Sequence, residues 1–313
     1  MPSVLTLTFS PCIDKSTTVP ELIPSKKLKC SQPELDPGGG GINVARAIKK
    51  LGGMATAVYP AGGYTGKAFN ALLAKENIPV IIVESANDTR ENIVILEEKT
   101  SKQYRFNMPA TPLSENEWKE CLQAVENSKD VEFIVASGSL PPGVPDDIYA
   151  RLAIIARTKK AKFVVDTSGE ALKQAAKEGV YLLKPNLGEL SSLVNSNHYL
   201  QENEIEAVAK QVITRGNCEV LVVSMGDKGA MLFTSDLMKK IVPPPVEVKS
   251  TVGAGDSMVA GIVYALSTGK SLETALEYGV AAGTAATLHP GTELCSKIET
   301  ERLLAVIHTG ETY

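Results

Sequence analysis

Short runs of β-branched and other apolar residues recur along the chain, separated by stretches in which apolar residues return every three or four positions. Runs of this length are typical of buried strands, and the wider spacing is typical of helices with one buried face. We predict strands at residues 4–9, 55–59, 80–83, 133–136, 163–165, 181–183 and 220–223. The predicted helices include residues 42–51, 66–76, 147–159, 205–215 and 255–267.

This alternation predicts an α/β fold, in which a mainly parallel sheet is sandwiched by helices on both faces. Ligands bind beyond the carboxyl ends of the strands in such sheets. Polar residues and glycines that directly follow a predicted strand are therefore the first candidates for chemistry.

Two segments, residues 15–37 and 91–108, break the alternation. Prolines interrupt strand-like pieces in the first, and the second has two strand-like halves around a polar turn, which predicts a β-hairpin. Together they would form a small sheet whose apolar face needs a cover. We expect a lid over the site or a contact with a partner subunit. Because no repeat or long linker divides the chain, we expect one domain over residues 1–313 that includes this lid.

Charge and composition narrow the class of protein. A formal net charge of -4 and a pI near 5.6 provide no general attraction for nucleic acid or an anionic membrane. The five cysteines are odd in number and form no CxxC pair, and no stretch approaches the ~20 apolar residues of a membrane span. We therefore expect a cytoplasmic protein that binds small ligands and has neither a nucleic-acid partner nor a membrane partner.

Four consecutive glycines, Gly38 to Gly41, precede a helical pattern that contains Asn43. Glycine lets a backbone approach a ligand closely, and the amides at a helix start can face that ligand. A sharp turn between a strand and a helix is the alternative, and the run alone leaves both open.

A second glycine loop, formed by Gly253, Ala254 and Gly255, leads through Asp256 into an apolar helical run. Its backbone amides would point at charge that develops on a transferring phosphoryl group, and Asp256 would accept a hydroxyl proton. Acids are also favoured at helix starts without any catalytic duty, so Asp256 alone does not decide between the two.

Two further polar loops follow predicted strands. Asn186 and Glu189 would organise hydrated Mg²⁺ and phosphate, because Mg²⁺ keeps several waters and needs few protein ligands. A helix cap is the alternative for this pair. The loop from Ser224 to Gly229 offers another glycine turn at a strand end, for which a plain hairpin turn is the alternative.

Taken together, the motifs PGGGGINVAR (37–46), SGSLP (137–141), KPNLGE (184–189) and TVGAGDS (251–257) resemble the ribokinase-like family of carbohydrate kinases, almost end to end. The resemblance implies the ribokinase-like fold with a small β lid. The segments YRF (104–106), VPPP (242–245) and 291–296 are most similar to the branch that phosphorylates fructose 6-phosphate at its C1 hydroxyl with ATP, in glycolysis. The related 1-phosphofructokinases and tagatose-6-phosphate kinases remain alternatives, although they usually have Lys where this chain has Gly40. A sugar-phosphate sensor without activity is the alternative that is not an enzyme.

The resemblance also implies roles for individual residues. Asp256 would be the general base, with an anion hole from Gly253, Ala254 and Gly255. Sugar contacts would come from Asp14, Gly39, Gly40, Asn43 and Ser139, and the substrate phosphate would be held by Arg90. Lys27 and Arg105 would act from the lid, with Arg105 reaching the neighbouring subunit's site in a homodimer. Excess MgATP would give a tetramer and inhibition.

Cofactor contacts follow from the same resemblance. ATP would be bound by Lys184, Asn186, Ser224, Gly226, Gly229 and Thr251, and Glu189 would order Mg²⁺ through water. A K⁺ site would be built largely from carbonyls at Ser250, Val252, Ala286, His289 and Gly291. His289 and Glu293 stand where the resemblance leads us to expect Asn and Arg.

Overall fold

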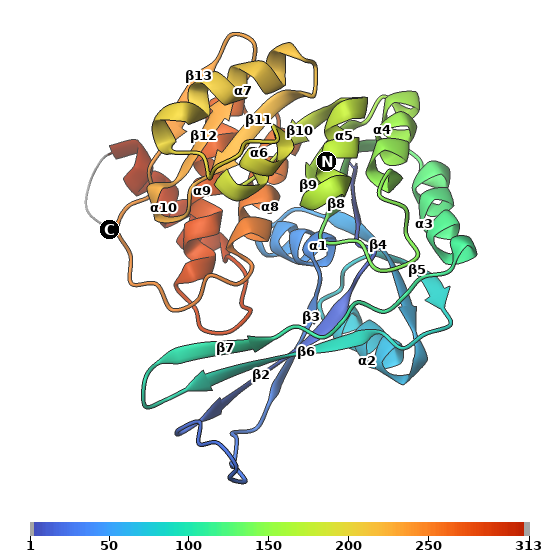
Figure 1. Cartoon of the computed structure of the whole chain (residues 1–313), viewed down its shortest axis with the longest axis vertical. Coiled ribbons are helices and arrows are strands. Elements are labelled where there is room, and N and C mark those ends of the chain that lie inside the picture. The colour runs from blue at the N-terminus through green and yellow to red at the C-terminus, as the bar shows by residue number, and fades with distance from the viewer. Residues whose placement is uncertain (1–2, 310–313) are drawn as a thin grey trace.

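A nine-stranded sheet runs through the protein in the computed structural model, which describes residues 3–309 (Figure 1). The strands lie in the order β13-β12-β11-β10-β9-β8-β1-β4-β5, and all pairs from β11 to β5 are parallel. Their bounds are β1 (Ser3–Leu7), β4 (Ala55–Gly62), β5 (Val80–Ser85), β8 (Val131–Ser137), β9 (Lys162–Asp166), β10 (Val180–Leu183), β11 (Cys218–Ser224), β12 (Ala230–Phe233) and β13 (Met238–Ile241). The mainly parallel α/β sheet that the alternation predicted is confirmed.

Helices cover both faces of this sheet because successive strand residues point to opposite sides. In β1, for example, Val4 packs into one apolar cluster and Leu5 into the other. One face is covered by α1 (Gly40–Lys50), α2 (Gly63–Lys75), α8 (Ala254–Ser267), α9 (Leu272–Thr287) and α10 (Lys297–Thr309). The other is covered by α3 (Glu115–Asn127), α4 (Ile148–Lys159), α5 (Gly169–Glu178), α6 (Leu187–Leu193) and α7 (Ile205–Thr214). Within residues 3–309, no helix has both the length and the apolar character needed to cross a membrane.

A second, four-stranded sheet projects from this body (Figure 1). It has the order β3-β2-β6-β7 and consists of β2 (Cys12–Val19), β3 (Glu34–Gly38), β6 (Arg90–Glu97) and β7 (Lys102–Phe106). The expected hairpin is the antiparallel pair of β6 and β7, and the two segments join through a parallel pairing of β2 with β6. The small sheet expected from the two irregular segments is confirmed.

Strand pairing sorts the side chains of the small sheet onto two faces. We call one the apolar face; it carries Leu35, Ile93, Ile95, Tyr104 and Phe106. The other is the polar face; it carries Asp14, Arg90, Asn92 and Arg105. Leu35, Tyr104 and Phe106 are exposed, so the apolar face has no full cover within residues 3–309.

Candidate active site

The first turns of α1 and α8 meet beside the carboxyl ends of the parallel strands and bring Asn43 to Asp256. The amide Nδ2 of Asn43 donates a hydrogen bond of 2.9 Å to Oδ2 of Asp256. The hydroxyl of Ser137, the last residue of β8, donates to the other carboxylate oxygen at 3.4 Å. Asp256 is half-buried and keeps its place in the first turn of α8, as the glycine loop before it predicted.

The surroundings of Asp256 make it a weaker acid than an ordinary aspartic acid. Burial raises its pKa to about 7, and the nearby carboxylate of Asp166 adds to the rise. The hydrogen bond from Asn43, the charge of Lys184 and the hydroxyl of Ser137 act in the opposite direction. A carboxyl group with a pKa near neutrality is suited to accept and release a proton at physiological pH.

A buried ion pair lies next to Asp256. Nζ of Lys184, which follows β10, is 3.1 Å from Oδ1 of Asp166 at the end of β9, and Lys184 is only 5% exposed. Burial alone would lower the pKa of Lys184, but the carboxylate of Asp166 outweighs it and the pKa is raised, so the ammonium stays charged. Asp166 was not among the predicted site residues. Its signal in the sequence is a lone carboxylate directly after the apolar run 163–165.

The glycine run lets the start of α1 pack closely against the strand ends. Gly39 is the N-cap and has φ 113°, whereas Gly40 and Gly41 already lie in the helix. A Cβ on Gly40 would lie 2.3 Å from Oγ of Ser137 and 2.6 Å from its carbonyl carbon. The close approach expected of this run is therefore, at Gly40, an approach to the backbone at the end of β8.

On the polar face of the small sheet, Asp14 lies between Cys12 and Asn92. Its Oδ1 accepts a 2.9 Å hydrogen bond from Nδ2 of Asn92 and a 3.4 Å bond from the thiol of Cys12. Burial raises the pKa of Asp14, while these two hydrogen bonds and the charge of Arg90 oppose the rise. Asn92, which the sequence did not single out, thus fixes the orientation of a predicted sugar contact.

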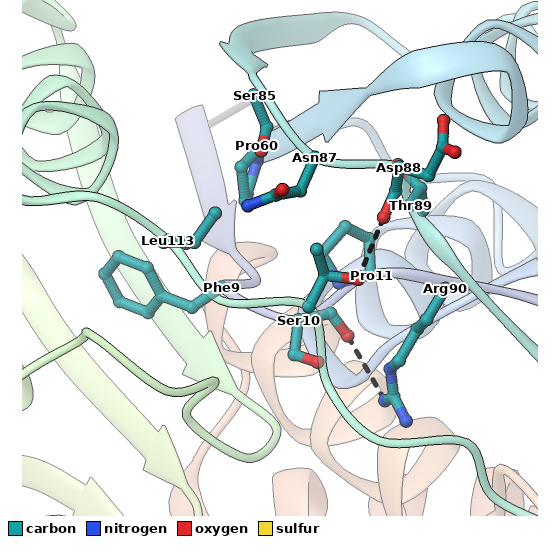
Figure 2. A pocket seen from close by; sticks show the side chains of 11 residues that line it. Phe9, Ser10, Pro11, Pro60, Ser85, Asn87, Asp88, Thr89, Arg90 and Leu113 are labelled. Atoms are coloured by element: carbon teal, nitrogen blue, oxygen red, sulfur yellow. Dashed lines mark hydrogen bonds between the residues drawn. The ribbon is translucent and has the colours of Figure 1, made fainter.

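Arg90 begins β6 beside a small cavity of about 20 Å³ under the segment that joins β1 to β2 (Figure 2). Its guanidinium donates to the carbonyl of Ser10 at 3.4 Å, as Figure 2 shows, and to that of Met108 at 3.2 Å. Its Nε is buried and has no hydrogen-bond partner among residues 3–309. The charge of Arg90 faces no carboxylate at salt-bridge distance there, which leaves it available for an anion.

Two other predicted lid residues occupy different places. Nη2 of Arg105 on β7 donates to Oγ1 of Thr251 at 3.3 Å, so this strand reaches the loop before α8 within one chain. Lys27 lies exposed between β2 and β3, where the small sheet is farthest from the body (Figure 1). The chain by itself therefore brings Arg105, but not Lys27, to the other predicted residues.

The predicted nucleotide contacts lie along neighbouring strand ends. Asn186 and Ser224 form a parallel bridge, which places the ends of β10 and β11 side by side. Asn186 also caps α6: its Oδ1 accepts from the amide of Glu189 at 2.9 Å, and Oε2 of Glu189 accepts from the amide of Asn186 at 2.8 Å. The loop with Gly226 and Gly229 is the turn between antiparallel β11 and β12. The helix cap at Asn186 and the hairpin turn at Gly226 and Gly229, which were the structural alternatives for these two loops, are therefore both present.

The donor set at Glu189 suits a hydrated Mg²⁺ shared with phosphates. Burial raises the pKa of Glu189, and one of its oxygens accepts from the amide of Asn186. Among residues 3–309, no three His, Cys, Asp or Glu side chains converge to hold a metal. A magnesium ion here would therefore take its other ligands from water and nucleotide, as is usual for Mg²⁺.

Three of the five residues predicted for K⁺, namely Ser250, Val252 and Gly291, are linked by hydrogen bonds. Oγ of Ser250 donates to the carbonyl of Gly291 at 2.7 Å and accepts from the amide of Val252 at 3.2 Å. The ring of His289 is engaged elsewhere, with Nε2 2.9 Å from Oε2 of Glu299. Because its ring is paired with Glu299, His289 would offer a cation its backbone carbonyl and not its imidazole.

Comparison with known proteins gives full-length matches. Residues 7–299 match the model of the pfkB family carbohydrate kinases. The chain is 44% identical to "ATP-dependent 6-phosphofructokinase isozyme 2" of Escherichia coli, over 98% of this chain and 99% of that protein. It is 30% identical to a 1-phosphofructokinase of Borreliella burgdorferi, over 99% of each.

Solved structures give the same match. Crystal structures of Escherichia coli phosphofructokinase-2 with fructose-6-phosphate (42% identity) and with potassium (44%) each have a TM-score of 0.93 and cover 98% of this chain and 100% of theirs. A tetrameric inhibited form of that enzyme is also known, with 43% identity, a TM-score of 0.93 and the same coverage. Ribokinase of Thermotoga maritima, at 21% identity and a TM-score of 0.76 over 97% of this chain and 100% of that one, shares the fold.

Proposed function

This chain belongs to the pfkB family of carbohydrate kinases, and we propose that it transfers the γ-phosphoryl group of ATP to the C1 hydroxyl of fructose 6-phosphate, in glycolysis. The products would be fructose 1,6-bisphosphate and ADP. The observation that carries the proposal is Asp256, held by Asn43 at a helix start with a pKa of about 7. The choice of sugar phosphate rests on the similarity to the Escherichia coli enzyme over the whole chain.

The chemistry we propose is an in-line displacement. The C1 oxygen forms a bond to the γ-phosphorus, the bond from that phosphorus to the bridging oxygen of ADP breaks, and Asp256 takes the hydroxyl proton. Amides of Gly253, Ala254 and Gly255 at the start of α8 face the charge on the phosphoryl oxygens. Mg²⁺, when bound, neutralises charge on the nucleotide phosphates. Positioning and electrostatics then supply most of the rate enhancement.

Each group of residues has a proposed ligand. The sugar contacts are Asp14, Gly39, Gly40, Asn43 and Ser139, with Arg90 on the phosphate. The nucleotide contacts are Lys184, Asn186, Ser224, Gly226, Gly229 and Thr251. Glu189 orders the water shell of Mg²⁺, and carbonyls of Ser250, Val252, Ala286, His289 and Gly291 hold K⁺.

The small sheet is, in this proposal, a lid that a second copy of the chain completes. Its polar face carries Asp14 and Arg90 toward the site, and its apolar face is left for the lid of the partner. Lys27 and Arg105 then act at phosphates, with Arg105 reaching the neighbouring subunit's site. Within one chain Arg105 contacts Thr251, a proposed nucleotide contact, so in the dimer its side chain would exchange this contact for the partner's site. A tetramer would form with excess MgATP, as the known tetrameric inhibited form suggests.

A coupled assay of the purified protein tests the substrate. We expect kcat/KM to be highest for fructose 6-phosphate when fructose 6-phosphate, fructose 1-phosphate and tagatose 6-phosphate are compared at fixed MgATP. A preference for fructose 1-phosphate would instead assign the protein to the 1-phosphofructokinase branch. Tight sugar-phosphate binding with no ADP release from any of the three would favour a sensor.

A further inference from the structure

Helix α1 begins without a capping side chain of its own. Its N-cap is Gly39, which has no side chain to accept a hydrogen bond. The amide of Ile42, the third residue of the helix, donates instead to Oγ1 of Thr8 at 2.9 Å. In most helices a Ser, Thr, Asp or Asn at the N-cap itself accepts this bond. Thr8 therefore caps α1 from a different segment, directly after β1.

Thr8 is held firmly and lies tightly against the glycine run. It is 2% exposed, and its own amide donates to the carbonyl of Val58 in β4 at 3.1 Å. A Cβ on Gly39 would lie 2.9 Å from the methyl carbon of Thr8, and a Cβ on Gly41 would lie 2.6 Å from its hydroxyl oxygen. The main sheet thus fixes one side chain that contacts both the start of α1 and the loop before it.

The next residue of α1 connects this cap to Asp256. The amide of Asn43 donates to the carbonyl of Gly39 at 2.8 Å and closes the first helical turn. The side chain of Asn43 then reaches Oδ2 of Asp256 at 2.9 Å. The orientation of that turn sets where the amide group of Asn43 lies.

We propose that Thr8 is a positioning residue for phosphoryl transfer: its hydroxyl fixes the first turn of α1 so that Asn43 holds Asp256 toward the accepting hydroxyl. The inference rests on the proposed kinase function, in which Thr8 contacts neither substrate nor the reacting atoms. Without the hydroxyl, the buried amide of Ile42 loses its partner, and the turn shifts to find another. A shift of about 1 Å at reacting groups costs roughly 100-fold in rate.

Two substitutions distinguish the effect of the Thr8 hydroxyl from the effect of the side-chain volume. Thr8→Val keeps the volume and the methyl group but removes the hydrogen-bond acceptor, and Thr8→Ser keeps the acceptor but removes the methyl group. We expect Thr8→Val to lower kcat for fructose 6-phosphate by about tenfold to 100-fold, with KM for ATP unchanged. Here kcat is calculated from the concentration of protein that binds ATP, so that misfolded protein does not contribute. Thr8→Ser should keep most of the wild-type kcat.

A second pair covers the case in which Thr8→Val does not fold. Thr8→Ala and Thr8→Ser differ by one oxygen atom, so kcat of the Ala variant should fall well below that of the Ser variant. Equal kcat for Ala and Ser, or a Val variant as active as wild type, overturns the inference. An equal loss in kcat and in affinity for ATP also overturns it, because that indicates a general structural role. A wild type inactive on all three sugar phosphates contradicts the proposed function itself.

Discussion

The protonation state of Asp256 depends on residues from distant parts of the chain, among them Ser137 at the end of β8. Asn43 comes from α1, Asp166 from the end of β9, and Lys184 from the segment after β10. The local sequence made Asp256 a candidate base, because a glycine loop followed by an apolar helix is visible in it, and the family resemblance then favoured the base over a plain helix-start acid. It could not predict a pKa of about 7, since the charges that act on Asp256 come together only when the sheet forms. Asp166 was missed because a single carboxylate after a short strand has no motif around it.

The raised pKa predicts how activity changes with pH. Asp256 accepts a proton only when it is deprotonated, so kcat/KM for the sugar phosphate should rise with pH and level off above a midpoint near pH 7. Asn43→Ala removes a hydrogen bond that lowers the pKa of Asp256, and it should move this midpoint to higher pH.

Asn217→Ala is the matched control for this pH experiment, because Asn217 donates to the carbonyl of Ala176 away from the site. Its midpoint should equal that of wild type. A wild-type midpoint near the ordinary aspartate value would contradict the raised pKa of Asp256, and an Asn43→Ala profile that does not move would show that Asp256 is not the group that titrates.

Among the elements, α1 starts earlier than its sequence prediction. The helix begins at Gly40, two residues earlier than predicted, so the glycine run is partly helical. Glycine is disfavoured inside helices, and a prediction from local pattern therefore starts the helix after the run. The contact between Gly40 and Ser137, which explains the glycine, joins residues far apart in the chain and cannot be read from either segment.

Filling the space at Gly40 should harm both stability and activity. The new methyl group of Gly40→Ala would collide with Ser137, including its backbone carbon, and overpacking of this kind costs about 1–3 kcal/mol. The melting temperature should fall, and kcat should fall because α1 moves away from Asp256. Gly188→Ala is the control in the first turn of α6, where the nearest atom is a Tyr199 side-chain carbon at 3.3 Å. Equal melting temperatures for the two variants would refute this packing argument.

The exposed apolar face of the small sheet predicts a dimer. Phe106 is 47% exposed on the apolar face, and Phe106→Glu should place a charge in the proposed contact between lids. We expect sedimentation to show a dimer for wild type and a monomer for this variant at micromolar concentration. Ile298→Glu on α10, where the side chain is 81% exposed, should leave the dimer intact. A Phe106→Glu protein that sediments like wild type would place the dimer contact elsewhere.

At the scale of the whole molecule, the α/β class and the seven parallel strands of the large sheet, from β11 to β5 in sheet order, followed from apolar runs and their spacing. Strands β12 and β13 were not predicted; each has only four residues, and β13 contains Lys239 and Lys240. The parallel pairing of β2 with β6 was also outside the prediction. It joins two segments that are separated by β3, α1, β4, α2 and β5, and no local pattern encodes such a contact.

Only part of the candidate site could be predicted from the sequence. Residues that follow strands, such as Asn186 and Ser224, became candidates because parallel strands end at one edge, whereas Lys184 was expected only from the family resemblance. Thr8, Ser137 and Asn92 were missed, because each acts through a neighbour that is remote in the chain. Their roles become visible only as hydrogen bonds in the folded protein.

The most direct test of Asp256 as the base is the turnover of Asp256→Asn with fructose 6-phosphate and MgATP. The substitution keeps the size of the side chain but removes the proton acceptor. We expect kcat to fall by roughly 10²–10⁴-fold while ATP binding, followed by calorimetry, stays close to that of wild type. A variant that binds ATP normally and retains most of its turnover would contradict a catalytic role for Asp256.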